Sequence, residues 1–300
     1  MCDAHNVYHT VELVSAIGVQ KSKQRIDHTI IKSFLAGVFL SFSGLFLLIV
    51  GGGSAPLGQS LGPGIQRMIQ AAVFPVGLIL IIMTSAELFT GNTMILMIST
   101  LDRKTTLLNL IISWIVSYCG NFAGCLFCSG ILVYYAGILS NDPYLSFTVQ
   151  LAEVKGNIEW HQIFLRGIAG DWLICLGIWL TISARELHSK IIAIYLPIWL
   201  LISVGYEHSI ANMFTVQMGM MLGANLSVGK YISCVMIPVT LGNIVGGTFF
   251  VGFLYWYLYM PKKTDIETKD NDKSSADDVS QVVEKQEELG QSKQNINIIL

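Results

Sequence analysis

Two apolar stretches of this chain are each interrupted by a charged, turn-forming cluster. The first stretch, from about 71 to 99, contains Ser85-Ala86-Glu87-Leu88-Phe89-Thr90-Gly91-Asn92. The second, from about 191 to 222, contains Gly205-Tyr206-Glu207-His208-Ser209-Ile210-Ala211-Asn212. Non-helical backbone is tolerated at membrane depth only where protein or a watery cavity satisfies its polar groups. Each stretch is therefore predicted to be two half-helices joined by a loop that faces an interior path.

Four further apolar stretches are long enough to cross the roughly 30 Å hydrocarbon layer, which takes about 20 apolar residues. They cover approximately residues 30–52, 107–137, 163–184 and 231–260. The composition agrees, since 53% of the chain is hydrophobic and 13% is charged, where soluble domains are about a quarter charged. We expect an all-α integral membrane protein with six transmembrane helices, whose pore domain covers residues 29–260 and whose surroundings are a lipid bilayer.

Charge and cysteine usage exclude other classes of protein. A formal net charge of −2 offers no basic face for phosphate groups, so nucleic acid is excluded as the main partner. Five of the six cysteines lie inside apolar runs and are interpreted as small buried side chains, including the CxxC pair Cys125 and Cys128. We expect no cofactor and no metal.

Basic residues flank the spans unevenly, and this asymmetry predicts orientation. The richer side has Lys21, Lys23, Arg25, Lys32, Arg103, Lys104, Arg185, Lys190, Lys262 and Lys263. The other side has Arg67, Lys155 and Lys230, with Arg166 at its margin. Both termini are therefore predicted to be cytoplasmic.

The two ends of the chain lie outside the predicted pore domain. In the N-terminal segment 1–28, Val11, Val14 and Gly18 share one helical stripe, which predicts a helix on the membrane interface; a frayed tail is the alternative. Residues 261–300, rich in Asp, Glu, Lys, Gln and Ser, predict a disordered acidic tail. Such a tail fits a eukaryotic plasma membrane protein, with organelle membranes as the alternative.

The two halves of the chain echo one another. Residues 34–38 are echoed by 164–168, the pair Glu87 and Asn92 by Glu207 and Asn212, and residues 120–124 by 242–246. Because each half has three spans, the second half must insert upside down, which predicts an inverted 3+3 repeat about an axis in the membrane plane. Folds of this kind belong to channels and transporters.

Ionisable residues inside spans indicate function, because each costs about 3 kcal/mol or more unless it is paired or solvated. Four such residues are Glu87, Asp171, Glu207 and His208. The glycines of the echoed segments 120–124 and 242–246 have a simpler interpretation as close helix packing. We expect the ionisable residues to lie along the interior path.

The chain resembles the formate/nitrite transporter family of anion channels and transporters over about residues 10–260. The matching segments are 86–92, Gly120-Asn121, 173–176 with Trp179, 205–213 and 237–247. The resemblance implies a homo-pentamer of aquaporin-like protomers, each with its own pore, in which the second and fifth spans are broken.

The resemblance also implies roles for individual residues. His208 corresponds to a pore histidine, Thr90 to its hydroxyl partner and Lys155 to an outer-vestibule lysine, with Asn92 and Asn212 on the path. The apolar constrictions correspond to Phe74, Leu78, Leu88, Phe89 and Leu201. The family more often has Phe at the position of Leu201 and Asn at that of Asp171.

The resulting hypothesis is transport of small monovalent anions or their weak acids, namely formate, nitrite, lactate or hydrosulfide, coupled to protons through His208. A bare anion cannot cheaply cross apolar rings, whereas a protonated acid can. A plain anion channel without net proton movement is one alternative. A neutral-solute pore of aquaporin type is another, although the Asn-Pro-Ala signatures are absent, and an intramembrane enzyme using Glu207 and His208 is more remote.

Overall fold

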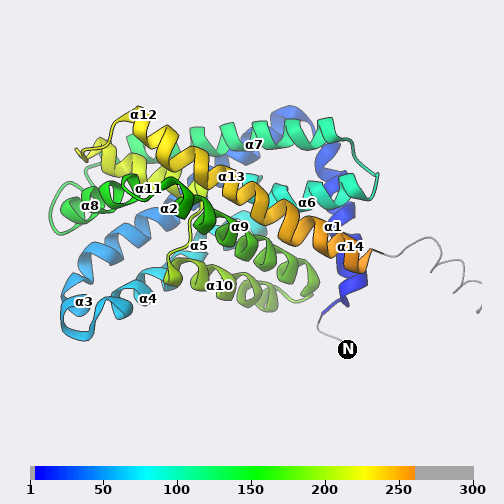
Figure 1. Ribbon diagram of the computed structural model, residues 1–300, viewed down its shortest axis with the longest axis horizontal. Coiled ribbons are helices and arrows are strands. Elements are labelled where there is room, and N and C mark those ends of the chain that lie inside the picture. The colour runs from blue at the N-terminus through cyan, green and yellow to red at the C-terminus, as the bar shows by residue number, and fades with distance from the viewer. Residues whose placement is uncertain (1–3, 261–300) are drawn as a thin grey trace, which may run out of the picture. The chain divides into compact units, whose positions relative to one another are not determined.

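The structure, a computed structural model, describes residues 4–260, and the predicted acidic tail 261–300 lies outside the described residues. The described chain is helical (Figure 1). Its first half contains α1 (Val7–Ser22), α2 (Ile26–Gly53), α3 (Ala55–Leu61), α4 (Pro63–Val73), α5 (Pro75–Met83), α6 (Phe89–Leu101), α7 (Leu107–Phe127) and the π-helix η1 (Cys128–Tyr135). The second half contains α8 (Tyr144–Gly156), α9 (Trp160–Ser183), α10 (Leu187–Val204), α11 (Ser209–Met221), α12 (Val228–Lys230), η2 (Tyr231–Met236), α13 (Ile237–Val245), η3 (Gly246–Phe253) and α14 (Leu254–Tyr259).

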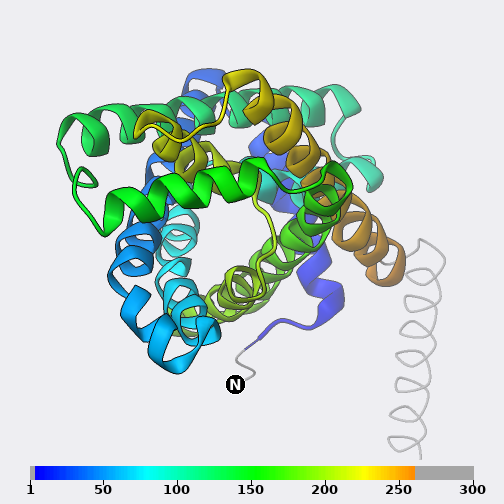
Figure 2. The ribbon, with the colours of Figure 1, turned by 60° about the vertical axis from the view of Figure 1, so that its left-hand side comes forward.

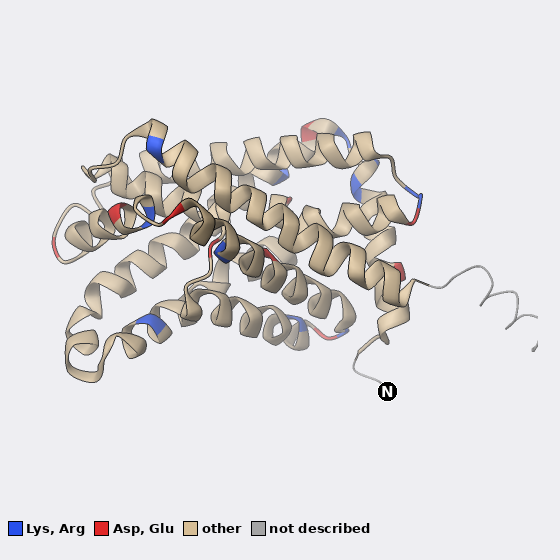
Figure 3. Ribbon diagram, viewed as in Figure 1, with Lys and Arg blue, Asp and Glu red and all other residues tan. Residues whose placement is uncertain are grey.

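Six helical stretches within the described residues are long and apolar enough to cross a membrane, which confirms the predicted number of spans. They are Ile26–Gly53, Pro63–Met83, Leu107–Tyr135, Trp160–Ser183, Leu187–Val204 and Val228–Tyr259. Figure 3 shows long lengths of these helices without any Lys, Arg, Asp or Glu. The second stretch begins at Pro63, earlier than the predicted residue 71, because α4 carries polar residues that hide it from an apolar criterion.

The two interrupted stretches are broken at the predicted clusters. Helix α5 ends at Met83 and α6 begins at Phe89, while α10 ends at Val204 and α11 begins at Ser209. Gly205 ends α10 in the left-handed conformation, with φ of 83°, which glycine adopts without steric cost. Helices α6 and α11 therefore both begin in the interior of the protein.

Equivalent contacts relate the two halves and correct one of the sequence echoes. A Cβ added to Gly124 would lie 2.1 Å from the carbonyl oxygen of Phe34, and one added to Gly246 would lie 2.2 Å from that of Ile168. Phe34 thus corresponds to Ile168, one turn beyond the Phe164 that the echo selects. The similarity of residue types therefore aligned the two halves one helical turn away from the correct position. The correct alignment is given by the contacts of Gly124 and Gly246 with the backbone of the neighbouring helix.

Each half also contains a short helix that lies outside the six spans. In α1, Val11, Val14 and Gly18 are buried, and an added Cβ on Gly18 would meet Ser99 of α6. Helix α8 takes the same place in the second half, where Gly219 of α11 approaches Ala152. The two helices lie at opposite ends in Figure 1, and α8 (green) runs beside α2 (blue) in Figure 2. The repeat therefore includes one more helix per half than the six spans, of which the sequence predicted α1 but not α8.

Candidate functional site

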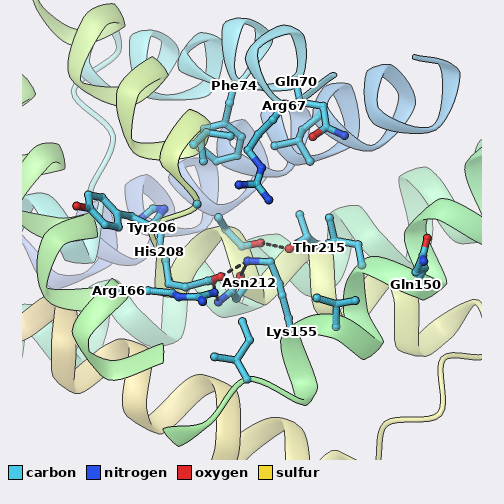
Figure 4. Close-up of a pocket in the computed structure, with 18 of the residues that line it drawn as sticks. Arg67, Gln70, Phe74, Gln150, Lys155, Arg166, Tyr206, His208, Asn212 and Thr215 are labelled. Atoms are coloured by element: carbon cyan, nitrogen blue, oxygen red, sulfur yellow. Dashed lines mark hydrogen bonds and ion pairs between the residues drawn. The ribbon is translucent and has the colours of Figure 1, made fainter. Parts of the chain in front are cut away.

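A cluster of three side chains, of which Glu207 and Asn212 are buried and Lys155 is half-buried, lies at the break between α10 and α11. The Lys155 ammonium lies 2.6 Å from Glu207 Oε2 and donates to Asn212 Oδ1 over 2.8 Å. Asn212 Nδ2 donates to the same Glu207 oxygen over 2.9 Å. Figure 4 shows Lys155 and Asn212 side by side at one wall of a cavity, whose lining also includes Glu207. We call Lys155, Glu207 and Asn212 the outer triad, after the predicted orientation.

A similar cluster, without a hydrogen bond from the lysine to the asparagine, lies at the break between α5 and α6. Lys21 Nζ lies 2.5 Å from Glu87 Oε2, to which Asn92 Nδ2 donates over 3.1 Å. Lys21, Glu87 and Asn92 form the inner triad. The two carboxylates have similar surroundings, since the side chains of Glu87 and Glu207 are 4% and 5% exposed. Each buried carboxylate is thus neutralised by a lysine from the short helix of its own half.

His208 and Thr90 meet between the two triads. Thr90 Oγ1 lies 3.0 Å from His208 Nε2, and both residues are buried. His208 is the N-cap of α11 and Thr90 the second residue of α6, so this pair joins the starts of both half-helices. Helix N-termini carry partial positive charge and unbonded N–H groups, which favour an anion nearby. His208 Nδ1 has no hydrogen-bond partner among the described residues.

Two buried amides hold the breaks in place. Asn121 Oδ1 accepts from the backbone N–H of Phe89, and its Nδ2 donates to Ser33 O and Glu87 O. Asn243 does the same in the second half, accepting from Ser209 N and donating to the carbonyls of Gly167 and Glu207. Each amide thus satisfies backbone that no helix pairs, which is the condition for non-helical chain at membrane depth.

Two cavities approach the His208–Thr90 pair from opposite sides. The outer cavity, of about 380 Å³, is lined by His208, Phe74 and the outer triad, among others. The inner cavity, of about 260 Å³, is lined by Leu78, Leu88 and the inner triad. Three residues of the predicted constrictions are buried at these cavities, Phe74 in the lining of the outer one and Leu78 and Leu88 in that of the inner one.

Four predicted site residues do not line these cavities in the described structure, namely Thr90, Phe89, Leu201 and Asp171. Phe89 packs its ring against Trp114 and Tyr118, at centroid distances of 6.2 and 5.1 Å. Leu201 and Asp171 are buried elsewhere. Asp171 Oδ2 accepts from Thr93 Oγ1 over 2.8 Å, and its Oδ1 has no described partner. Asp171 thus lies behind α6 and does not face either cavity.

Sequence reasoning missed the second lysine of the site. Lys21 was counted only as a residue that sets orientation, although its place in the chain before a span matches that of Lys155. Asn121 and Asn243 lie within the echoed glycine segments, but the sequence did not show that their side chains bind the backbone at the breaks. Among the described residues, no group of three or more His, Cys, Asp or Glu is arranged to hold a metal ion.

Comparisons with known proteins point to one family. Residues 8–257 match the family described as formate/nitrite transporter. A probable formate transporter of Methanothermobacter thermautotrophicus is 37% identical over 265 residues, which cover 84% of this chain and 96% of that protein. Formate-nitrite transporter 3 of Toxoplasma gondii is 37% identical over 249 residues, 81% of this chain and 49% of that longer protein.

A solved structure is similar in both fold and sequence. It is described as a pentameric formate channel with formate bound, and it matches with a TM-score of 0.68 and 30% identity. The match covers 78% of this chain and 97% of the channel. The similarity therefore extends over nearly the whole channel domain.

Proposed function

Because the chain belongs to the formate/nitrite transporter family, we propose that it carries small monovalent anions such as formate or nitrite across a membrane. Its six long apolar helices make it a multi-pass membrane protein. Its relatives include a probable formate transporter and a pentameric formate channel, which supports formate as a substrate. Lactate and hydrosulfide remain substrates to be tested beside it.

The observation that carries this proposal is the arrangement of two lysine triads on either side of one histidine. Each triad offers an ammonium at the edge of a cavity, where an anion arrives still hydrated. An ammonium has three donors, and the Lys155 ammonium uses two of them on Glu207 and Asn212. The third is available to a passing anion, so the triad attracts an anion without binding it as tightly as an unpaired charge would.

The apolar barrier that we propose between the two cavities favours one charge state of the substrate over the other. Phe74, Leu78 and Leu88 are almost fully buried and offer no hydrogen bonds to a dehydrating anion. Removing an ion from water without compensation is costly, whereas a neutral weak acid crosses more cheaply. We propose that His208, hydrogen-bonded to Thr90 Oγ1, relays or orients the proton that makes formate neutral at this point.

The proposed assembly is a homo-pentamer in the plasma membrane. Both termini of each protomer lie on the cytoplasmic side. The pentameric formate channel supports the number of subunits, and the distribution of basic residues supports the orientation. Each protomer has both cavities and both triads within its own chain. Because one chain supplies all of these groups, we propose that each protomer has its own pore.

Uptake measurements with one pore variant and one matched control test the proposal. Wild type, His208→Asn and His188→Asn are purified, sized by chromatography and placed in liposomes containing a pH-sensitive dye. His188 is an exposed histidine on α10, outside both cavities. Uptake of labelled formate is then followed between about pH 5 and 8, the range in which histidine titrates.

We expect wild type and His188→Asn to take up formate faster at lower external pH and to acidify the interior. His208→Asn should form the same oligomer, with strongly reduced uptake or a changed pH profile. Formate uptake that moves no protons would reject proton coupling and leave a plain anion channel. A wild type that carries water but no formate would reject anion transport altogether.

A further inference from the structure

Two arginines line the outer cavity in addition to the outer triad. Arg67 extends from α4 and Arg166 from α9. Figure 4 shows the two guanidinium groups reaching into the cavity from opposite sides, with Lys155 close by. These residues stood out in the sequence only as the few basic residues on the sparsely charged side.

Neither guanidinium has an ion pair or a hydrogen-bond partner among residues 4–260. Of the described residues that line the outer cavity, Glu207 alone is acidic, and it is already paired with Lys155. Counting Arg67, Arg166 and Lys155 against Glu207 gives 3 − 1 = +2 for this cavity. Two positive charges of this cavity therefore have no acidic partner among the described residues.

The inner cavity is built differently at the equivalent places. Lys32 corresponds to Arg166, because their carbonyl oxygens accept from Glu87 N and Glu207 N respectively. However, Lys32 Nζ donates to Gln24 Oε1 over 2.8 Å. The charged residues in the described lining of the inner cavity are Lys21, Lys32 and Glu87. Their formal charges add to 2 − 1 = +1, one less than in the outer cavity. The arginine pair is thus a feature of one side and not a consequence of the repeat.

The chemistry of the pair identifies the class of ligand. A guanidinium is always charged and presents five donors in a planar fork that matches the two oxygens of a carboxylate. Two such groups facing one cavity neutralise a ligand that carries two carboxylates better than one that carries a single carboxylate. Gln70 and Gln150, also in the lining, add uncharged polar groups around it.

We propose that Arg67 and Arg166 form an outer binding site for small dicarboxylates, separate from the outer triad. A doubly charged anion held there cannot enter the apolar barrier at Phe74, because desolvating two charges costs more than desolvating one. The bound dicarboxylate therefore obstructs the outer cavity. Binding is independent of the proposed transport function, whereas the block of uptake rests on it.

Binding of malonate to the purified full-length protein in detergent tests the site without any transport. Malonate and acetate are titrated by calorimetry at low salt, because screening weakens such attraction. The proteins are wild type, Arg67→Gln, Arg166→Gln and Lys230→Gln. Lys230 is a matched control at the same end of the protein, where it donates to Asn157 outside the cavity. Arg67→Lys keeps the charge but loses the fork.

We expect wild type to bind malonate more tightly than acetate. Each Arg→Gln change should weaken malonate binding by roughly tenfold or more, since charge-assisted hydrogen bonds are lost, and Arg67→Lys should weaken it less. Lys230→Gln should bind as wild type does. The site is overturned if wild type shows no preference for malonate, or if Lys230→Gln loses as much as the arginine variants. If Arg67→Gln fails to fold, Arg166→Gln and Arg67→Lys decide.

Liposome measurements then separate this inference from the proposed function. External malonate should inhibit formate uptake by wild type and by Lys230→Gln, and much less by Arg166→Gln. Normal formate uptake with no malonate binding would reject only the dicarboxylate site. Malonate binding to a protein that takes up no formate would instead reject the proposed transport and leave the site intact.

Discussion

Removing Lys155 while keeping Glu207 should destabilise the protein strongly. The change Lys155→Met leaves a carboxylate that is 5% exposed with Asn212 Nδ2 as its remaining described partner, and it also leaves Asn212 Oδ1 without its donor. Breaking a buried ion pair by deleting one member costs roughly 3–5 kcal/mol. Lys155 itself is 21% exposed, so water compensates in part, and about 3 kcal/mol is the expected loss.

Removing both charges should restore most of that loss. In Lys155→Met combined with Glu207→Gln, no uncompensated charge remains, and the cost falls to about 1 kcal/mol of lost hydrogen bonding. Unfolding by SDS in mixed micelles, followed by tryptophan fluorescence, measures all members of this double-mutant cycle. The corresponding cycle of Lys21→Met and Glu87→Gln should give a similar coupling, because the inner pair has nearly the same distance and burial.

The result that would refute this reasoning is a double variant no more stable than Lys155→Met alone. It would mean that the single change acts through lost packing of the lysine stem and not through an uncompensated Glu207. A Lys155→Met protein as stable as wild type would show that water reaches the carboxylate freely. Either outcome would also remove the basis for treating the two triads as equivalent.

Three further predictions concern the breaks, the packing behind them and the orientation. Gly247→Ala should sharply reduce assembly, seen by size-exclusion chromatography, because the added Cβ would lie 2.0 Å from Thr93 Oγ1, while Gly130→Ala, with nothing within 4 Å, should assemble normally. Asn243→Leu should cost several kcal/mol in SDS unfolding, since three buried backbone groups lose their partner; a loss below about 1 kcal/mol would show that other groups satisfy them. Epitope tags on both termini should stay inaccessible in intact cells, and labelling of either from outside would overturn the orientation.

The six spans and both breaks could be predicted from the sequence because each leaves a local signal. Long apolar runs mark the spans, and Glu87 and Glu207 stand out within them. The start of the second span at Pro63 could not be found in this way, because α4 carries the polar residues Gln66, Arg67 and Gln70. Helix α8 was also missed, since its mixed composition resembles a loop until α11 is packed against it.

The site was predictable where its members lie near the breaks, and not where it depends on distant segments. His208 and Thr90 were paired correctly through the resemblance, and their hydrogen bond spans 118 positions of the chain. The partner of Glu87 is 66 positions away, on the predicted N-terminal helix, whose sequence pattern does not show that it packs beside the break. Phe89 was placed among the apolar constrictions through the resemblance, but its ring packs against Trp114 and Tyr118.

The central pair, His208 and Thr90, does not obey the repeat that relates the two halves of the chain. By the correspondence of Glu87 with Glu207, the position of His208 in the second half is occupied by Leu88 in the first, and that of Thr90 by Ile210 in the second. Two identical half-chains in this inverted arrangement would place either two histidines or none at the centre. Covalent fusion of the halves allows a single imidazole, which lines the outer cavity, while Leu88 lines the inner one. The two cavities therefore present chemically different groups at the centre of the protein, an imidazole on the outer side and an aliphatic side chain on the inner side.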